Sequence, residues 1–214
     1  MSISLKNGFI IAAVFVLLFG CTGALKKPAM RIDYYSLDYD PPGPAALSPL
    51  DAVVGVQRFQ VAPIYNTNKI IYQDKQFKRN AYTYHKWRAN PGDLVSYFLA
   101  RDLGESAVFK AVFTLDKKLP VSHTIEGRVD EFFEFDRDNL WEAVLSVSVT
   151  LLKENEPDIS KRVLMQKKYR MRKPCRQKNP QALAEAMSQA MAAVSKNIND
   201  DLYRLLAEEY KAAN

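Results

Sequence analysis

The chain has 214 residues, with 30 lysines and arginines against 24 aspartates and glutamates, so its formal net charge at pH 7 is +6. This length accommodates one domain with a sizeable core, and no internal repeat or second domain is evident. With two cysteines, the chain cannot hold a framework of several disulfides.

The N-terminal apolar run is too short for a membrane anchor. It extends over 11 residues, Phe9 to Phe19, which as a helix would span only ~16 Å, whereas a bilayer core is ~30 Å thick. Lys6 gives the run a positive start and Gly20 is a small residue at its end, as in a secretory signal peptide. We therefore predict a signal peptide over residues 1–20. The alternative is a buried N-terminal helix of the core.

Cys21 makes this prediction more specific. The sequence Leu18-Phe19-Gly20-Cys21 resembles the lipobox of bacterial lipoproteins, although Phe19 is bulkier than the usual residue at its position. The resemblance implies cleavage before Cys21, a diacylglycerol on its thiol and a further acyl chain, of the palmitate kind, on its amino group. Two or more such chains anchor a protein stably. Thr22 stands where an aspartate would resemble the inner-membrane retention signal, which favours the outer membrane. The alternative is an ordinary signal peptide with a chance cysteine.

Removal of residues 1–20 takes away one basic residue, so the mature chain carries 29 basic and 24 acidic residues and a charge of +5. Residues 21–30 are expected to form a short lipidated tether, followed by a single periplasmic domain over residues 31–214. If Cys21 is lipidated, Cys175 has no partner for an internal disulfide. We interpret Cys175 as a passive thiol rather than a nucleophile.

The first half of the domain is predicted to consist mainly of strands. Its aromatic and β-branched segments are separated by proline-rich or polar ones. The expected elements are a strand over 31–39, a loop over 40–49, a strand over 51–62, hairpin strands over 69–73 and 77–87 with a turn near 74–75, and a short strand over 108–113.

One helix is expected in the middle of the chain. Asn90-Pro91 is typical of a helix start, because asparagine can cap the helix and proline suits its first position. The helix should end near Gly104. Leu94, Tyr97 and Phe98 follow at helical spacing and are expected to share its buried face.

The second half shows the clearest strand pattern. Apolar residues alternate with polar ones over residues 125–135, 141–151 and 163–171. Turns over 136–139 and 154–160 separate the three segments. Three such strands joined by short turns predict an antiparallel meander.

The chain closes with a long helix that begins at Asn179-Pro180. Its apolar residues step by three or four, so we expect one buried stripe packed on the sheet rather than an exposed coiled-coil arm. The predicted fold class is α/β in the sense of an α+β sandwich, with a mixed, largely antiparallel sheet, one mid-chain helix and this long C-terminal helix. The stripe consists of Leu183, Met187, Met191, Val194, Ile198, Leu202 and Leu205.

The basic segment over residues 167–173 has the composition of a nucleic-acid patch. In a strand, however, Lys168 and Arg170 share one face while Tyr169 and Met171 share the other. We interpret the segment as a solvated sheet face and expect no nucleic acid among the partners. Weak attraction to anionic head groups or to an acidic partner is the second interpretation.

The sequence contains no motif that marks an active site. His85 and His123 are not at metal-ligand spacing, and no G-x-S-x-G, glycine-rich phosphate loop or H-E-x-x-H motif occurs. Glu131 and Glu134 fall on opposite faces of an ideal strand, so a shared acid–base role is not expected. We predict that the protein is not an enzyme and binds neither a cofactor nor a metal.

Several segments follow the order seen in one lipoprotein family. After the lipobox come YYSLDY (34–39), VGVQRFQVAP (54–63), KIIYQ (69–73), AYTYHKWRANPGDLVSYFLARDL (81–103) and IEGRVDEFF (125–133). In this order they resemble the ABC-type transport auxiliary lipoproteins of the PqiC or YmbA type, over nearly the whole mature chain. The resemblance implies a mixed α/β sandwich similar to the N-terminal domain of TolB.

The same resemblance implies a function. Such a lipoprotein would sit on the periplasmic face of the outer membrane and dock the MCE-domain protein of an ABC transport system, which moves phospholipid or other hydrophobic cargo and supports membrane integrity. A ring-like homo-oligomer would suit a partner with rotational symmetry.

A rival hypothesis is a lipoprotein that regulates a peptidoglycan synthase or another envelope-assembly machine. Such regulators typically carry a long disordered tether. Here about ten residues separate Cys21 from the first predicted strand, at most ~35 Å when fully extended. This short tether favours the transport hypothesis.

Tyr82, Tyr84 and Trp87 are the candidate partner-binding residues, because aromatic side chains anchor interfaces. In an ideal strand Tyr82 and Tyr84 share one face while His85 and Trp87 share the other, so one set should belong to the core. If Trp87 is an exposed anchor, Trp87→Ala should weaken complex formation without lowering the melting temperature.

Overall fold

The computed structural model describes residues 30–114, 120–138 and 140–213. By its contacts the chain divides into two units, Met1–Arg31 and Ile32–Asn214. The predicted signal peptide and Cys21 lie outside the described residues, so the boundaries at residues 20 and 30 stay predictions. The description below concerns the unit from Ile32 onward.

This unit contains nine strands, a 3-10 helix and three α-helices among its described residues. They are β1 (Asp33–Tyr35), β2 (Leu50–Val56), β3 (Gln60–Val61), η1 (Pro63–Tyr65), β4 (Lys69–Lys75), β5 (Lys78–Trp87), α2 (Pro91–Glu105), β6 (Phe109–Thr114), β7 (His123–Arg137), β8 (Leu140–Lys153), α3 (Ile159–Arg162), β9 (Val163–Pro174) and α4 (Pro180–Ala213).

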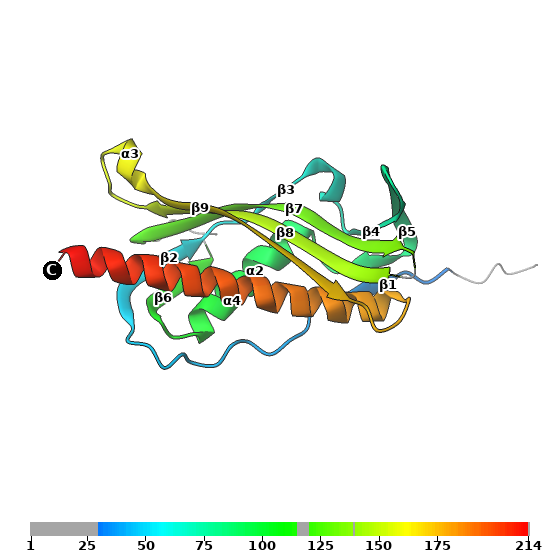
Figure 1. Cartoon of the computed structure of the whole chain (residues 1–214), viewed down its shortest axis with the longest axis horizontal. Coiled ribbons are helices and arrows are strands. Elements are labelled where there is room, and N and C mark those ends of the chain that lie inside the picture. The colour runs from blue at the N-terminus through cyan, green and yellow to red at the C-terminus, as the bar shows by residue number, and fades with distance from the viewer. Residues whose placement is uncertain (1–29, 115–119, 139, 214) are drawn as a thin grey trace, which may run out of the picture. The chain divides into compact units, whose positions relative to one another are not determined.

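All nine strands belong to one mixed sheet with β7 at its centre (Figure 1). On one side β7, β8 and β9 form the predicted antiparallel meander. On the other side β2, β3 and β4 pair with successive parts of β7, all in parallel. The outer pairings of β6 with β2 and of β1 with β5 are also parallel. The sheet is thus mixed, with its longest pairings antiparallel, as predicted, although the sequence did not indicate which strands pair in parallel.

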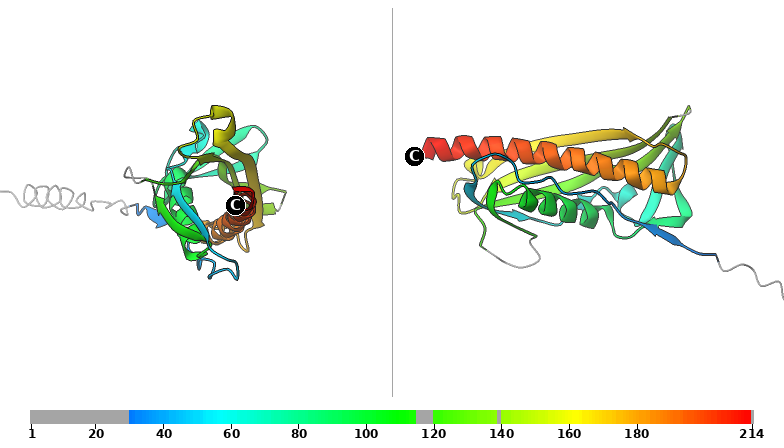
Figure 2. Two further views of the ribbon diagram at one scale, coloured as in Figure 1. Left: turned by 90° about the vertical axis from the view of Figure 1, so that its left-hand side faces the viewer. Right: turned by 90° about the horizontal axis from the view of Figure 1, so that it is seen from below.

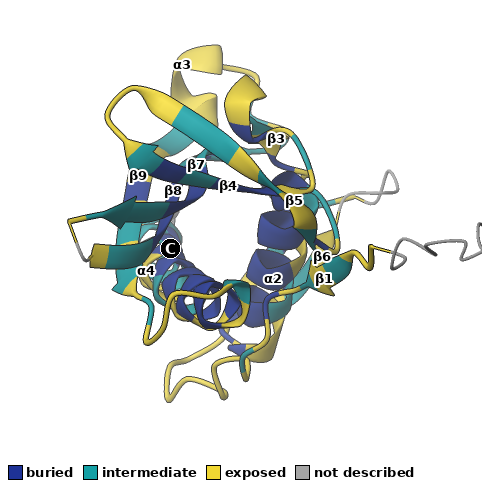
Figure 3. Cartoon of the chain, turned by 90° about the vertical axis from the view of Figure 1, so that its right-hand side faces the viewer, coloured by how far each residue is buried: buried dark blue, intermediate teal, exposed yellow. Residues whose placement is uncertain are grey.

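The sheet curls into a half-barrel around two helices. Seen from its end, the strands enclose α4 and α2 (Figure 2). Buried residues lie where these helices face the sheet, and exposed residues lie mainly in loops and hairpin tips (Figure 3). The predicted packing of the long helix against its own sheet is confirmed, because α4 contacts both β8 and β9.

Helix α2 begins as predicted. The Asn90 side chain accepts a hydrogen bond from the backbone amide of Gly92 at 3.0 Å, and Pro91 is the first helical residue. Leu94 and Phe98 are buried, but Tyr97 is 61% exposed. The expectation that Tyr97 shares the buried face was wrong, because a spacing of three residues turns it to the flank of the Leu94–Phe98 line.

The strand predicted over residues 51–62 is broken between Val56 and Gln60. In the gap the backbone amide of Phe59 donates to the Ser96 hydroxyl of α2 at 2.7 Å, so it leaves the strand ladder. The Phe59 ring is fully buried against Gly127, where a Cβ atom would lie 2.3 Å from a ring carbon. Glycine on β7 therefore makes room for the ring that the break turns inward.

The buried stripe of α4 is confirmed up to Leu202 and then differs by one residue. Leu206 is fully buried, whereas Leu205 is only partly buried. A step of four residues from Leu202 keeps Leu206 on the line that faces the sheet. Leu205 still packs against the core while partly buried, so the predicted stripe is in contact with the core along its length, and its fully buried line continues to Leu206.

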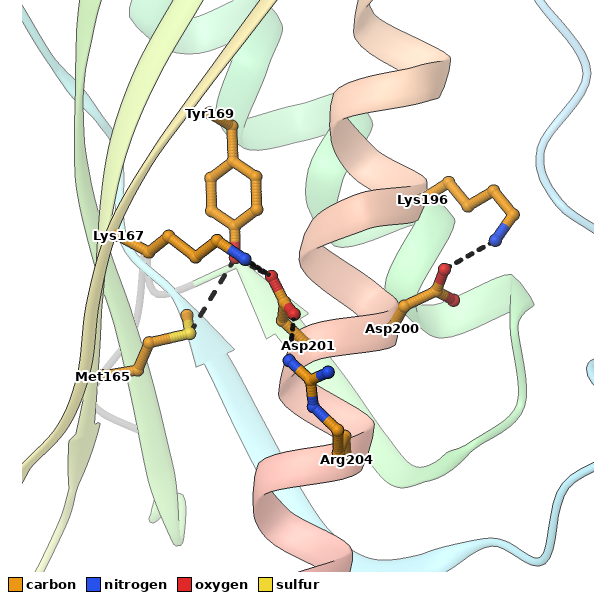
Figure 4. A network of polar contacts seen from close by, with 7 residues as sticks. All are labelled: Met165, Lys167, Tyr169, Lys196, Asp200, Asp201 and Arg204. Carbon is orange, nitrogen blue, oxygen red and sulfur yellow. Dashed lines mark hydrogen bonds and ion pairs between the residues drawn. The ribbon is translucent and has the colours of Figure 1, made fainter.

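A carboxylate on α4 ties the helix to β9. Asp201 accepts hydrogen bonds from the Tyr169 hydroxyl at 2.8 Å and from Lys167, and Arg204 lies 2.6 Å from its other oxygen (Figure 4). Burial of Asp201 opposes its ionisation, but the hydrogen bonds from Lys167 and Tyr169 outweigh burial, so its pKa lies below the usual value. The adjacent Asp200 points away and pairs with Lys196 on the same helix.

Candidate functional site

Trp87, the first candidate anchor, lies in the core. Its side chain is 1% exposed and meets the Phe132 ring edge-on, with 5.1 Å between ring centroids. The hypothesis that Trp87 is an exposed anchor was therefore wrong. The contact that shows Trp87 to be a core residue is with Phe132 on β7. Phe132 is 45 positions away in the sequence, so no local pattern could reveal it.

Tyr82 is half-buried and belongs to a polar and aromatic cluster across three strands. Its hydroxyl donates to a carboxylate oxygen of Glu134 at 3.0 Å, and its ring lies 4.9 Å from that of Tyr72. Glu134 is 3% exposed. Burial raises the pKa of Glu134 above its usual value, and burial together with the neighbouring carboxylate also raises the pKa of Tyr82.

A bulge in β5 explains why the two predicted faces of this strand are mixed. Between the pairs Lys69–Lys86 and Ile71–Ala81 the register shifts, because β4 advances two residues while β5 advances five. Strict alternation is lost in this interval. As a result the rings of Tyr82 and His85, predicted on opposite faces, contact each other with 5.8 Å between centroids.

Tyr84 is the candidate residue that faces solvent. It is 38% exposed, and on the neighbouring edge strand β1 Tyr34 is 49% exposed and Ile32 is 38% exposed. In the parallel register Tyr34 pairs with Lys86, so these two residues share one face of the sheet. Tyr84 lies in the bulged interval of β5, so its exposure rather than its register places it at the surface. We call Ile32, Tyr34 and Tyr84 the β1–β5 patch.

Positive charge surrounds the β1–β5 patch. The Arg88 guanidinium lies 5.5 Å from the centroid of the Tyr34 ring. Among the described residues, neither Arg88 nor Lys86 forms an ion pair with a carboxylate. An exposed aromatic surface with unneutralised cations at its rim is the composition typical of a protein interface.

The basic face of β9 has a different character. Lys168, Arg170 and Arg172 are exposed on one face, as predicted, and each lies next to an acidic residue of β7 or β8. These partners are Asp130, Glu131 and Glu142. A groove of about 600 Å³ beside them is lined by polar residues, and its Arg58 and Arg128 are also paired with aspartates. The interpretation as a solvated, internally neutralised face is supported.

Glu131 and Glu134 separate as expected. Glu131 pairs with Arg170 on the solvated face, whereas Glu134 is buried beside Tyr82. The two carboxylates do not share a site.

A serine, a histidine and a glutamate meet at the end of the molecule where α4 ends. The Ser122 hydroxyl lies 2.9 Å from Nδ1 of His123, whose Nε2 lies 3.5 Å from Glu209, and a pocket of about 220 Å³ adjoins them. The Ser122 hydroxyl also donates to the Val53 carbonyl and accepts from the Val53 amide, so both backbone bonds hold it in the sheet edge. No motif could reveal this group, because Glu209 is 86 positions from His123.

Burial lowers the pKa of His123 despite the nearby Glu209. His123 therefore stays neutral near pH 7, and the bonds of Ser122 to the backbone serve the junction of β2 with β7. We interpret the group as a structural one.

Further candidates for a metal site, a membrane span or a reactive thiol were sought in the part of the chain that the structure describes. Within it no three histidine, cysteine, aspartate or glutamate residues are grouped to hold a metal ion. No helix there is long and apolar enough to span a bilayer. Burial raises the pKa of the Cys175 thiol to about 12, so little thiolate is present at neutral pH.

A curled, mixed sheet packed against α2 and α4 makes the described unit an α+β domain. A family model described as ABC-type transport auxiliary lipoprotein component matches residues 35–199. The chain belongs to this family, which is one of membrane-anchored envelope lipoproteins associated with ABC transport and is not a known enzyme family. No curated protein gives a significant match.

Solved structures share the fold. Protein XCC0632 from Xanthomonas campestris superposes with a TM-score of 0.74 at 16% identity, covering 84% of this chain and 99% of that one. Protein CT253 from Chlamydia trachomatis gives a TM-score of 0.50 at 9% identity, covering 72% of this chain and 96% of that one. At these identities the similarity concerns the fold alone.

Proposed function

We propose that this lipoprotein is anchored through Cys21 to the periplasmic face of the outer membrane and docks the MCE-domain protein of an ABC transport system. The system would carry phospholipid or another hydrophobic cargo between membranes. The observation that carries the proposal is the family match over residues 35–199, because an auxiliary lipoprotein of an ABC system needs a contact with that system.

The β1–β5 patch is the surface that we propose for this contact. Tyr34 and Tyr84 expose aromatic rings, and Lys86 and Arg88 surround them without a carboxylate partner among the described residues. Tyrosine and arginine are enriched where interfaces concentrate their binding energy. By contrast, the cations of the β9 face already have carboxylate neighbours, so an acidic partner would gain less by approaching them.

We include a ring of several copies in the proposal only because the proposed partner would have rotational symmetry. A transport bridge with rotational symmetry presents the same surface several times, and a symmetric homo-oligomer can meet each copy in the same way.

The proposal is tested by chemical crosslinking of the full-length lipidated protein in native membranes, followed by purification and mass spectrometry. We expect an MCE-domain protein to be recovered with the wild-type protein. Tyr34→Ala with Tyr84→Ala should reduce this recovery at least tenfold, since interface tyrosines can each contribute ~1–2 kcal/mol. The matched control is Tyr97→Ala, which removes an even more exposed tyrosine from α2 and should leave recovery unchanged.

Two results would contradict the proposal. One is recovery of a peptidoglycan synthase without any MCE-domain protein, which would favour a regulator of cell-wall synthesis. The other is equal recovery from the Tyr34/Tyr84 variant and the control, which would move the contact to another surface.

A further inference from the structure

The turn between β4 and β5 presents an unusual residue to solvent. Phe77 is 93% exposed and has a backbone φ of 62°. Glycine or asparagine ordinarily occupies such a left-handed position, since a side chain there is strained. The side chain of Phe77 contributes little to the core, so stability of the fold does not explain its presence.

Positive charge flanks Phe77 on both strands. Lys75 and Lys78 face each other across the turn, and both are exposed. Among the described residues neither forms an ion pair. We call Lys75, Phe77 and Lys78 the β4–β5 tip.

The β4–β5 tip lies at the end of the unit where the described chain begins. Strands β1 and β5 are parallel and β5 runs away from the tip, so Ile32 is on the side of β1 nearer the tip. From Tyr84 back to Phe77 is seven residues, or ~23 Å along a strand. Helix α4 starts at this same end and extends for 34 residues, which places its other end ~50 Å away.

The segment between Cys21 and Ile32 is long enough for a lipid on Cys21 and the β4–β5 tip to reach the same membrane surface. Ten residues, 22–31, separate Cys21 from Ile32 and can extend to ~35 Å. This exceeds the ~23 Å between the levels of Tyr84 and Phe77. The opposite end of the unit, with Ile159 on α3, lies much further from the tip (Figure 1).

We infer that the β4–β5 tip inserts Phe77 into the head-group layer of the membrane that carries the lipid anchor, with Lys75 and Lys78 on anionic phospholipid head groups. Aromatic rings favour this interfacial layer, and lysines are attracted to an anionic lipid surface. One acyl-anchored point leaves a domain free to rotate, whereas a second contact fixes its orientation. The inference rests on the lipid attachment at Cys21 that the proposed function includes.

The test uses full-length lipidated protein reconstituted into vesicles of phosphatidylethanolamine and phosphatidylglycerol, with and without brominated acyl chains. Phe77→Trp places a fluorophore at the tip, and Ile159→Trp is the matched control, since Ile159 is 82% exposed at the far end. Relative to the unsubstituted protein with Trp87 and Trp141, we expect the emission added by the Phe77→Trp substitution to lie at shorter wavelength in the presence of vesicles and to be quenched by bromine. Emission added by the Ile159→Trp variant should show neither change.

Neutralisation of the two lysines, or of the lipid surface, gives the second readout. In the Phe77→Trp background, Lys75→Gln and Lys78→Gln should each lower the equilibrium constant for insertion roughly fivefold on anionic vesicles. Vesicles of phosphatidylcholine alone should show weak quenching that these substitutions do not change.

The outcomes separate the inference from the proposed function. Protein that floats with the vesicles but gives an unquenched tip, or equal quenching at positions 77 and 159, would overturn the membrane contact and leave the anchor intact. Protein that fails to float with any vesicle would overturn the anchor at Cys21 and the inference with it. Quenching at position 77 alone supports the inference whatever partner the β1–β5 patch binds.

Discussion

Strands β5 and β9 look alike in the sequence and differ in the folded protein. Both combine aromatic or apolar residues with several lysines and arginines. In β9 the cations Lys168, Arg170 and Arg172 lie next to carboxylates, whereas Lys78 and Lys86 of β5 have no such partner among the described residues. One basic strand is neutralised within the domain, and the other remains available to a partner or a membrane.

The difference comes from the neighbouring elements rather than from the strands themselves. The carboxylates beside β9 belong to β7, β8 and α4. Strand β5 instead lies between β4 and the short edge strand β1, with Trp87 buried in the core and Tyr84 exposed. A basic, aromatic strand therefore indicates an interaction surface only when its neighbours leave the charges uncompensated.

The largest effect is expected from Trp87→Ala on the inner side of β5. Removal of a fully buried indole should lower the free energy of unfolding by ~3–5 kcal/mol. Urea unfolding followed by circular dichroism measures this change. The outer side of the same strand provides the control, since Tyr84→Ala should change stability by less than ~1 kcal/mol. Similar losses for the two variants would contradict the assignment of the two sides.

The next effect concerns the carboxylate that joins α4 to β9. Asp201→Asn should cost ~1–3 kcal/mol, because it weakens hydrogen bonds from Lys167 and Tyr169 to a charged acceptor. Asp200→Asn changes the neighbouring, exposed carboxylate and should cost no more than ~0.5 kcal/mol. Denaturant unfolding of both variants at pH 7 compares them.

The effect of Asp201→Asn on the free energy of unfolding should depend on pH. Since the pKa of Asp201 is lowered in the folded state, its contribution is present above its unfolded value and is lost as the pH falls through the folded one. The difference in stability between the wild type and Asp201→Asn should therefore shrink on acidification. A constant difference from pH 7 to pH 2 would contradict the role of the ionised carboxylate.

Glu134→Gln should produce a smaller change with the opposite pH dependence. Burial raises the pKa of Glu134 above 4.5, so the wild type loses stability as the pH rises from the unfolded pKa through the folded one. Glutamine can still accept the hydrogen bond from Tyr82 and carries no charge to bury. Unfolding measured from pH 4 to pH 8 should show a variant whose relative stability increases with pH; a decrease would contradict this account.

The smallest effect is expected at the β4–β5 tip. Phe77→Gly relieves the strain of a positive φ, which is worth ~1–2 kcal/mol, but increases the freedom of the unfolded chain by ~0.5–1 kcal/mol. The net change in the free energy of unfolding should lie between zero and a gain of ~1.5 kcal/mol. A clear loss in a thermal melt would mean that Phe77 supports the fold and would weaken its assignment to the membrane.

Local sequence patterns predicted most helices and strands. The pairing of the strands and the burial of individual side chains depend on contacts between distant residues. The Asn90-Pro91 start of α2, the meander and the stripe of α4 depend on neighbours within a few residues, so the sequence was sufficient for them. The parallel pairing of β4 with β7 and the bulge in β5 depend on residues far apart in the chain. Alternation placed Tyr84 and Trp87 on opposite faces, but only the contact with Phe132 shows that the Trp87 side is the core. Only the bulge brings Tyr82 to His85.

The measurement that tests the central claim most directly is site-specific photocrosslinking in native membranes. A photoreactive amino acid replaces Tyr84 on β5 in one sample and Lys168 on β9 in another, and the adducts are identified by mass spectrometry. We predict an adduct with an MCE-domain protein from position 84 and none from position 168. An MCE adduct from position 168 alone, or only a peptidoglycan synthase from position 84, would contradict the proposed docking surface.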